Sequence, residues 1–228
     1  MINITLPDST IARRLPFFLA MEDFLARQQL SEDAFFLWQV EPSVIYGRNQ
    51  VVENEVNLEY CQSHGIQVYQ RKSGGGCVYA DHDNLMLSFV TKEQQVGFAF
   101  NRFINMLLLV LRKMGVEATG TRHNDIMIGD RKVCGTACRK TPYGCVLHST
   151  MLYDTNMQHM LQAITPSQQK LAKNGVESVR QRITLLKDYT SLTLAEIKSL
   201  IVKSLCDNEK MLTADEVLQI EEIENQYH

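Results

Sequence analysis

Residues 71–90 of this 228-residue chain read RKSGGGCVYADHDNLMLSFV, with three consecutive glycines between a basic pair and two apolar runs. Because glycine has no Cβ atom, Gly74, Gly75 and Gly76 can adopt positive φ and turn their N–H groups toward a ligand. Successive N–H groups of this kind bind anions, and the guanidinium group of Arg71 can add a bidentate contact to phosphate or carboxylate. The stretch therefore predicts a phosphate-binding loop, although it matches neither common glycine-rich phosphate motif. A tight hairpin with a flexible tip is the alternative.

A second polar cluster lies downstream and contains a predicted hairpin. The apolar run Ile126–Ile128 is followed by a Gly-Asp turn, and Lys132 then opens the next extended segment. A lysine at the mouth of this hairpin could reach a ligand held by the glycine loop, whereas a solvated surface lysine is the simpler alternative. Asn124 and Asp125 could bind a ribose, an amide or a magnesium ion, or could only terminate a loop through side-chain bonds to the backbone.

Three motifs of this chain resemble the signatures of one enzyme family. Residues 70–89 are similar to R-R-x-S-G-G-G-A-V-Y-H-D-x-G-N-x-x-x-S-F, residues 121–137 to G-R-N-D-[IL] followed by G-[RK]-K-[IV]-S-G-[SN]-A, and residues 147–152 to H-H-G-T-L-L. These are signatures of the lipoate–protein ligases in the biotin/lipoyl protein ligase family. Residues 46–60 and 170–182 also resemble this family, so the likeness covers most of the chain.

The resemblance implies a fold and a reaction. The implied fold class is α/β (α+β), with a mixed β-sheet flanked by helices as in class II synthetases and biotin ligases, in one catalytic domain over residues 1–228. The implied reaction has two steps: the carboxylate of lipoate attacks the α-phosphate of ATP to give lipoyl-AMP, and the lipoyl group then passes to a lysine of an acceptor protein.

The resemblance also implies partners. The acceptors are expected to be lipoyl domains of 2-oxoacid dehydrogenase E2 subunits, the glycine cleavage H protein, or both. Many family members continue into a small C-terminal accessory domain that this chain does not contain, so a separate accessory-domain protein is a further expected partner.

Site residues follow from the same resemblance. Lys132 is expected to be the catalytic cation that bridges carbonyl and phosphate oxygens in both transition states. The residues expected to bind ATP and lipoyl-AMP are Arg71, Ser73, Gly74, Gly75, Gly76, Cys77, Val78, Tyr79, Asn124, Asp125 and Lys132. The residues expected to orient lipoate are Gly135, Ala137, His148 and Thr150. The cofactors are expected to be ATP and a magnesium ion held near Asp125.

Four positions depart from the family signatures. Cys77 and Ala80 replace the usual alanine and histidine, and Cys134 and Leu147 replace serine and histidine. These changes are expected near the acyl end of the pocket, which leaves the preferred acid, lipoate or octanoate, open.

Two other functions are compatible with these motifs. One is an ATP-independent lipoyl or octanoyl acyltransferase of the same fold, and the other is a non-catalytic lipoate-binding paralogue. In the acyltransferase, Cys77 could carry the acyl group if Arg71 or Lys72 lowered its pKa. A cysteine at an inward strand position is more often a small buried hydrophobe.

A structural zinc site is not expected from the cysteines and histidines. Cys134, Cys138, Cys145 and His148 are suitable ligand types. However, Cys134 and Cys138 would lie about 13 Å apart along an extended strand at ~3.3 Å per residue. Zinc ligands all lie within about 2.3 Å of one ion.

Composition favours a compact cytoplasmic enzyme. A net charge of −3 argues against a nucleic-acid partner, and 45% hydrophobic content suffices for one large core. The longest apolar run, Ile104–Leu111, is far shorter than the roughly 20 residues of a membrane span. The N-terminus shows no secretory signal, and six cysteines without secretory context favour reduced thiols.

Periodicity and end signals predict the main elements. Helices are predicted at 17–28, 55–63 and 98–114, and strands at 34–40, 44–46, 66–70, 77–80 and 85–90. Thr193 with Glu196, and Thr213 with Glu216, form capping boxes that predict two further helices. These last helices are expected to cover one face of the sheet and to carry no chemistry.

Overall fold

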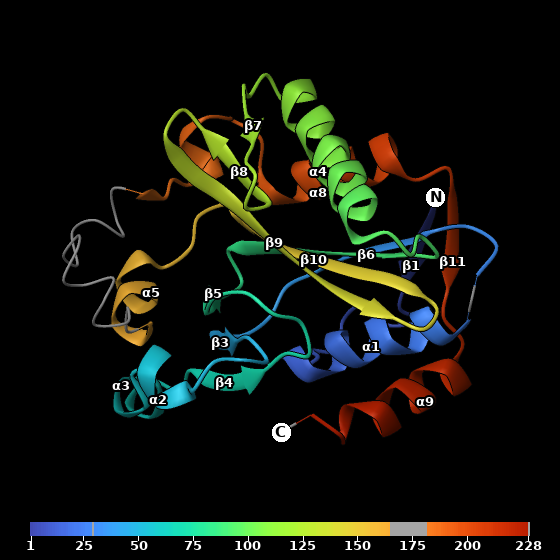
Figure 1. The fold of residues 1–228 in the computed structure, drawn as a ribbon, viewed down its shortest axis with the longest axis horizontal. Coiled ribbons are helices and arrows are strands. Elements are labelled where there is room, and N and C mark those ends of the chain that lie inside the picture. Colours follow the sequence, from blue (N-terminus) through green and yellow to red (C-terminus); the bar gives the residue numbers. More distant parts are fainter. Residues whose placement is uncertain (29, 165–181, 228) are drawn as a thin grey trace.

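The structure is a computed structural model that describes residues 1–28, 30–164 and 182–227. Among these residues, the main sheet has eight strands in the order β11-β1-β2-β6-β10-β9-β8-β7 (Figure 1). Its strands are β1 (Ile2–Thr5), β2 (Ala34–Trp38), β6 (Asn84–Thr91), β7 (Thr119–Gly120), β8 (Asp125–Ile128), β9 (Arg131–Thr141), β10 (Gly144–Leu152) and β11 (Asn208–Met211). β1 pairs parallel with both neighbours and the other pairs are antiparallel, so the sheet is mixed, as expected.

Helices cover both faces of this sheet (Figure 1). They are α1 (Leu15–Gln28) and α9 (Ala214–Glu224) on one face, and α4 (Val96–Lys113) and α8 (Leu194–Leu205) on the other. Successive residues of a strand point to opposite faces. Phe35 therefore packs in the core under α4 and α8, and Phe36 packs in the core under α1 and α9. The expected mixed sheet flanked by helices is confirmed. No helix of the described ranges is long and apolar enough to cross a membrane.

A smaller sheet carries the glycine loop at one end of the main sheet (Figure 1). It has the order β4-β3-β5, with β3 (Ser43–Tyr46), β4 (Gln67–Gln70) and β5 (Val78–Ala80). Three short helices flank it: α2 (Val52–Glu55), α3 (Leu58–Ser63) and α5 (Met157–Ala163). The glycine loop joins β4 to β5, so its two ends are anchored on either side of β3. A single 3-10 turn, η1 (Leu186–Asp188), precedes α8.

Most predicted elements are confirmed, including both C-terminal helices. The side chains of Thr193 and Thr213 accept hydrogen bonds from the N–H groups three residues later, which completes both capping boxes. The single helix predicted over 55–63 is wrong. α2 ends at Glu55 and α3 begins at Leu58, because the Asn57 side chain caps α3 by accepting a hydrogen bond from Tyr60 N at 3.0 Å.

The two strands at the β11 edge of the main sheet, β1 and β11, were not predicted. β1 and β11 are four residues long each and pair with one another from opposite ends of the chain. The family-like segment 170–182 lies, except for Arg182, outside the described residues.

Candidate active site

A cavity of about 190 Å³ lies between α1, the glycine loop and the β8–β10 part of the main sheet. Its lining residues come from all three signature motifs and from α1, β2, β3 and β6. They are Leu19, Trp38, Ile45, Arg71, Gly75, Gly76, Cys77, Val78, Met86, His123, Asp125, Lys132, Gly135, Thr136, Ala137, His148 and Thr150. The fold thus brings most of the predicted site residues to one place.

Arg71 holds the glycine loop in shape from inside. Its side chain is buried, and all three guanidinium nitrogens donate to protein acceptors. Nη1 bonds Ile45 O at 3.0 Å, Nε bonds Ser73 Oγ at 3.0 Å, and Nη2 bonds Gly74 O at 2.8 Å and Gly76 O at 2.6 Å. Burial also lowers the pKa of Arg71 to about 10. In place of the predicted bidentate contact to a ligand, Arg71 makes bonds to β3 and to the loop itself.

These bonds leave the amides of the loop unpaired. The carbonyls of Gly74 and Gly76 point toward Arg71, whereas the N–H groups of the three glycines donate to no acceptor among the residues described here. Gly75 has φ +94°, and a Cβ atom there would lie 3.1 Å from Nη2 of Arg71. A row of unpaired amides beside a cavity is the arrangement that binds anions, as predicted for this loop.

Lys132 lines the same cavity as this loop and lies at the start of β9. Its Nζ is 2.7 Å from Oδ1 of Asp125, and both side chains are partly exposed. A Cβ atom at Gly135 would lie 2.8 Å from both Cε and Nζ of Lys132, so the missing side chain leaves the space that the lysine occupies. The predicted hairpin is confirmed, since β8 and β9 pair antiparallel around its turn.

Asn124 shapes the turn before β8. It has φ +62°, a left-handed conformation that asparagine tolerates better than most residues. In the same turn, Thr121 Oγ1 accepts hydrogen bonds from His123 N and Asp125 N, each at 3.2 Å. Asn124 does not line the cavity, so its ligand role stays a prediction.

A buried hydrogen-bond network fixes His148 at the other wall. His148 Nε2 is 2.8 Å from Ser73 Oγ, and its Nδ1 is 3.1 Å from Oε2 of Glu22 in α1. Glu22 Oε1 also accepts from Ser88 Oγ at 2.6 Å, and Ser88 Oγ accepts from Trp38 Nε1 at 2.9 Å. With Nδ1–H donating to Glu22, the His148 Nε2 accepts from the Ser73 hydroxyl. The network therefore joins α1, β2, β6 and β10 to the glycine loop.

Asp23, the next residue of α1, is a second buried anchor for the loop. Its carboxylate accepts from Lys72 Nζ at 2.6 Å, from Arg139 and from Tyr227 Oη at 2.8 Å. Burial alone would raise the pKa of Asp23, but the hydrogen bond from Lys72 and the charge of Arg139 outweigh it and hold that pKa below its usual value. Lys72 lies between Arg71 and Ser73, so this cluster ties α1 directly to the loop.

The chain belongs by sequence to a known enzyme family. A family model described as the lipoyl protein ligase A/B catalytic domain matches residues 16–206. The chain is a member of this family.

Individual relatives agree with the family match. Lipoate--protein ligase 1 of Staphylococcus aureus is 32% identical over 215 residues, which cover 91% of this chain and 66% of the relative. The chain spans between about half and two thirds of the length of the curated relatives it matches.

Solved structures show the same fold. A bipartite lipoate protein ligase from Thermoplasma acidophilum, described with its E2 lipoyl domain, has a TM-score of 0.84 and 23% identity, covering 99% of this chain and 92% of that one. A lipoate-protein ligase A bound with ATP has a TM-score of 0.84 and 22% identity, covering 99% and 94%.

The departures of this family member from the signatures mostly lie away from the cavity, which corrects our expectation. Ala80, Cys134 and Leu147 are fully buried in the cores on the two faces of the main sheet. Only Cys77, of these four, lines the cavity. Tyr79 is also buried, in the core of the small sheet, so the structure gives no support for its predicted ligand role.

Burial raises the pKa of the cysteine thiols in this lipoyl ligase family member. Burial raises the pKa of Cys77 to about 12, despite the opposing charge of Arg71. This is the reverse of the shift that an acyl-carrying thiol needs. Burial likewise raises the pKa of Cys134 and Cys138 to about 12. Over the described ranges, no group of three or more His, Cys, Asp or Glu side chains could hold a metal ion.

Sequence reasoning missed one wall of the site. This wall is apolar and is formed by Leu19, Trp38, Ile45 and Met86. Glu22 accepts a hydrogen bond from His148, which also lines the cavity. The available signal was the acidic pair within the apolar stretch of α1, since a carboxylate on the buried side of a helix needs a partner.

Proposed function

We propose that this chain activates lipoate with ATP and transfers the lipoyl group to a lysine of a lipoyl domain. Membership of the lipoyl protein ligase A/B family supports this proposal, as does the name of the Staphylococcus aureus relative. The solved structures of the same fold include one described with ATP and one described with an E2 lipoyl domain.

The proposal rests mainly on one observation: Lys132 lines the same cavity as Gly75 and Gly76, whose amides are unpaired in the described ranges. The first step brings the carboxylate of lipoate to the α-phosphate of ATP, and these two anions repel each other. The Lys132 ammonium group and the N–H dipoles of the loop offset this repulsion and stabilise the charge that develops as pyrophosphate leaves. Asp125 keeps the ammonium group of Lys132 in place, and Gly135 leaves room for it.

The second step uses the same groups. The neutral ε-amine of the acceptor lysine attacks the carbonyl carbon of lipoyl-AMP, the bond from that carbon to the phosphate oxygen breaks, and an amide, AMP and a proton result. Lys132 can stabilise the developing charge on both the carbonyl and phosphate oxygens. The apolar wall of Leu19, Ile45 and Met86 suits the aliphatic part of lipoate.

A magnesium ion fits this site in one respect. Magnesium is usually bound through one or two carboxylates together with substrate phosphates, and Asp125 supplies one carboxylate at the cavity. Bound there, the ion would neutralise part of the phosphate charge.

The test is a transfer assay with the purified chain, lipoate, ATP and an E2 lipoyl domain. Mass spectrometry of the acceptor should show one lipoyl amide on a lysine, formed with release of AMP and pyrophosphate and absent without ATP. Transfer from an acyl carrier protein at the same rate without ATP would instead favour the acyltransferase.

A further inference from the structure

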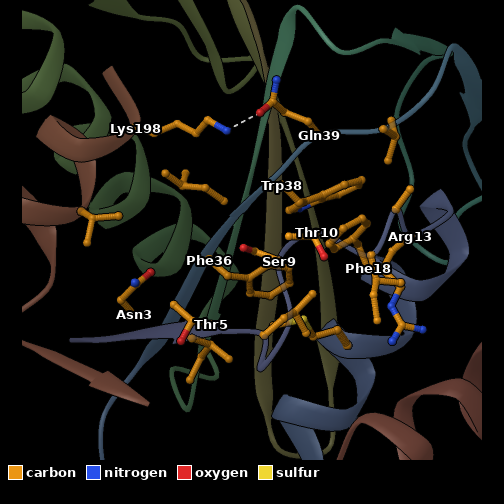
Figure 2. A pocket seen from close by; sticks show the side chains of 18 of the residues that line it. Asn3, Thr5, Ser9, Thr10, Arg13, Phe18, Phe36, Trp38, Gln39 and Lys198 are labelled. Carbon is orange, nitrogen blue, oxygen red and sulfur yellow. Dashed lines mark hydrogen bonds between the residues drawn. The ribbon is translucent and has the colours of Figure 1, made fainter. Parts of the chain in front are cut away.

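A second cavity lies outside the candidate active site. Its volume is about 850 Å³, compared with about 190 Å³ for the active-site cavity. It is formed by the loop after β1, by α1 and α8, and by β1, β2 and β11 (Figure 2). Of the signature motifs, only His82 lines this cavity, and the proposed reaction does not use it; Trp38 lines both cavities.

Apolar side chains form its floor and part of its rim. Phe18 stacks on Trp38 with ring centroids 4.8 Å apart, and Phe36 lies beside them (Figure 2). At the rim, Ile11 is 48% exposed and Met211 is 58% exposed, which are high values for such residues. A concave, largely apolar cavity of 300–1,000 Å³ with a few polar groups is typical of small-molecule sites.

Two lysines of α8, Lys198 and Lys203, line this cavity, and neither forms an ion pair with a carboxylate in the described ranges; Lys203 is exposed, whereas Lys198 is partly buried. Lys198 of α8 points toward Gln39 and donates from Nζ to Oε1 of its side-chain amide (Figure 2). Within the part of the chain that is described, no carboxylate lies within ion-pair distance of Lys198. Burial lowers the pKa of Lys198, because no anion offsets the loss of solvent.

The two carboxylates that line the cavity, Glu41 and Glu209, already have other partners. Glu41 pairs with His82 at 2.8 Å, and Glu209 accepts from the side chains of Asn3 and Thr5 at 3.5 and 3.4 Å. At the opposite end of the cavity, Arg13 pairs with Glu221 through Nη1, but its buried Nε has no acceptor in the described ranges. Positive groups with spare donors thus flank an apolar floor.

We propose that this cavity is a second ligand site, which binds an aliphatic carboxylate with its chain on the Phe18, Phe36 and Trp38 floor and its carboxylate at Lys198. The carboxylate replaces the neutral Gln39 amide as the main acceptor for Lys198 and forms a charge-assisted hydrogen bond. The proposal does not depend on the reaction assigned to the smaller cavity.

Trp38 makes this proposal directly measurable, because it is the single tryptophan of the chain and lines the cavity. Titration of the folded chain with dodecanoate should change the tryptophan fluorescence saturably. Lys198→Met should weaken binding by about tenfold or more, since it removes a charged hydrogen-bond donor. Lys198→Arg should retain binding. Lys140→Met, at an exposed lysine outside both cavities, should bind as the wild type does.

Dodecanoate could also enter the smaller cavity, so a second variant separates the two. Ala137→Phe fills the smaller cavity and should leave dodecanoate binding intact. Dodecylammonium, which has the same chain and the opposite charge, should bind at least tenfold more weakly. The proposal is overturned by absent saturable binding, by equal affinities of the wild type and Lys198→Met, by loss of binding in Ala137→Phe, or by equal binding of both amphiphiles.

Discussion

Gly75 and Gly135 lack side chains for a related reason: each leaves space for a cation beside the cavity. At Gly75 the cation is Arg71, which supports the loop from inside, and at Gly135 it is Lys132, which faces the cavity. Sequence analysis assigned both cations to ligand binding. Their roles separate only when the hydrogen-bond partners of Arg71 are known, and most of those partners are backbone carbonyls, which no residue pattern identifies.

Replacing Gly75 with valine should abolish ATP binding while leaving the chain folded. A β-branched residue resists φ +94°, and its side chain would press against Arg71 and block approach to the loop amides. Calorimetry would measure ATP affinity. Gly65→Val is the matched control, since Gly65 has φ +67°, nothing within 4 Å and no place in the cavity. Unchanged ATP affinity in Gly75→Val would count against the phosphate-binding loop.

Replacing Cys77 with alanine should preserve most of the activity. With its pKa raised to about 12, the thiol stays protonated at neutral pH and is not required by the adenylate route. Cys77→Ser should behave in the same way. If both variants lost turnover, and if a hydroxylamine-labile acyl group were found on Cys77 of the wild type, the acyltransferase would replace the ligase.

At the scale of elements, α1 supports the site through two successive buried acids. Glu22 fixes His148, and Asp23 binds Lys72 and Arg139. The helix itself was predictable from periodicity, but the roles of these acids were not, because their partners come from β6, β9, β10 and the glycine loop. Likewise, capping boxes predicted α8 and α9 locally, whereas β11 forms by pairing with β1 from the opposite end of the chain.

Asp23→Asn should lower the free energy of unfolding at pH 7 by about 1–3 kcal/mol, because it leaves charged donors with a neutral partner. The folded-state pKa of Asp23 is lowered, so its stabilisation is present above the ordinary aspartate pKa of about 3.9 and is lost as the pH falls toward the folded-state value. The difference between wild type and variant should therefore shrink between pH 5 and pH 2.

Urea denaturation at each pH would measure this difference, with Asp130→Asn as the control at an exposed turn. A difference that stayed constant with pH would show that Asp23 stabilises the fold by shape rather than by charge.

At the scale of the whole molecule, the fold brings the three signature motifs to one cavity from separate elements. Their order and chemistry were readable from the sequence, and the mixed sheet followed from the family resemblance. Two features of the structure could not be predicted from the sequence. The apolar wall from α1, β2 and β6 uses residues that look like ordinary core. The second cavity combines β1, near the start of the chain, with α8 and β11, near its end.

The role proposed for Lys132 is to stabilise acyl-adenylate formation within this chain. The most direct measurement is lipoate-dependent ATP–pyrophosphate exchange by the wild type, Lys132→Ala and the control Lys140→Ala, whose lysine lies on the same strand outside the cavity. We predict lipoate-dependent exchange for the wild type and the control, and a rate lower by about 10²-fold or more for folded Lys132→Ala. Exchange at the wild-type rate in folded Lys132→Ala would contradict the assignment.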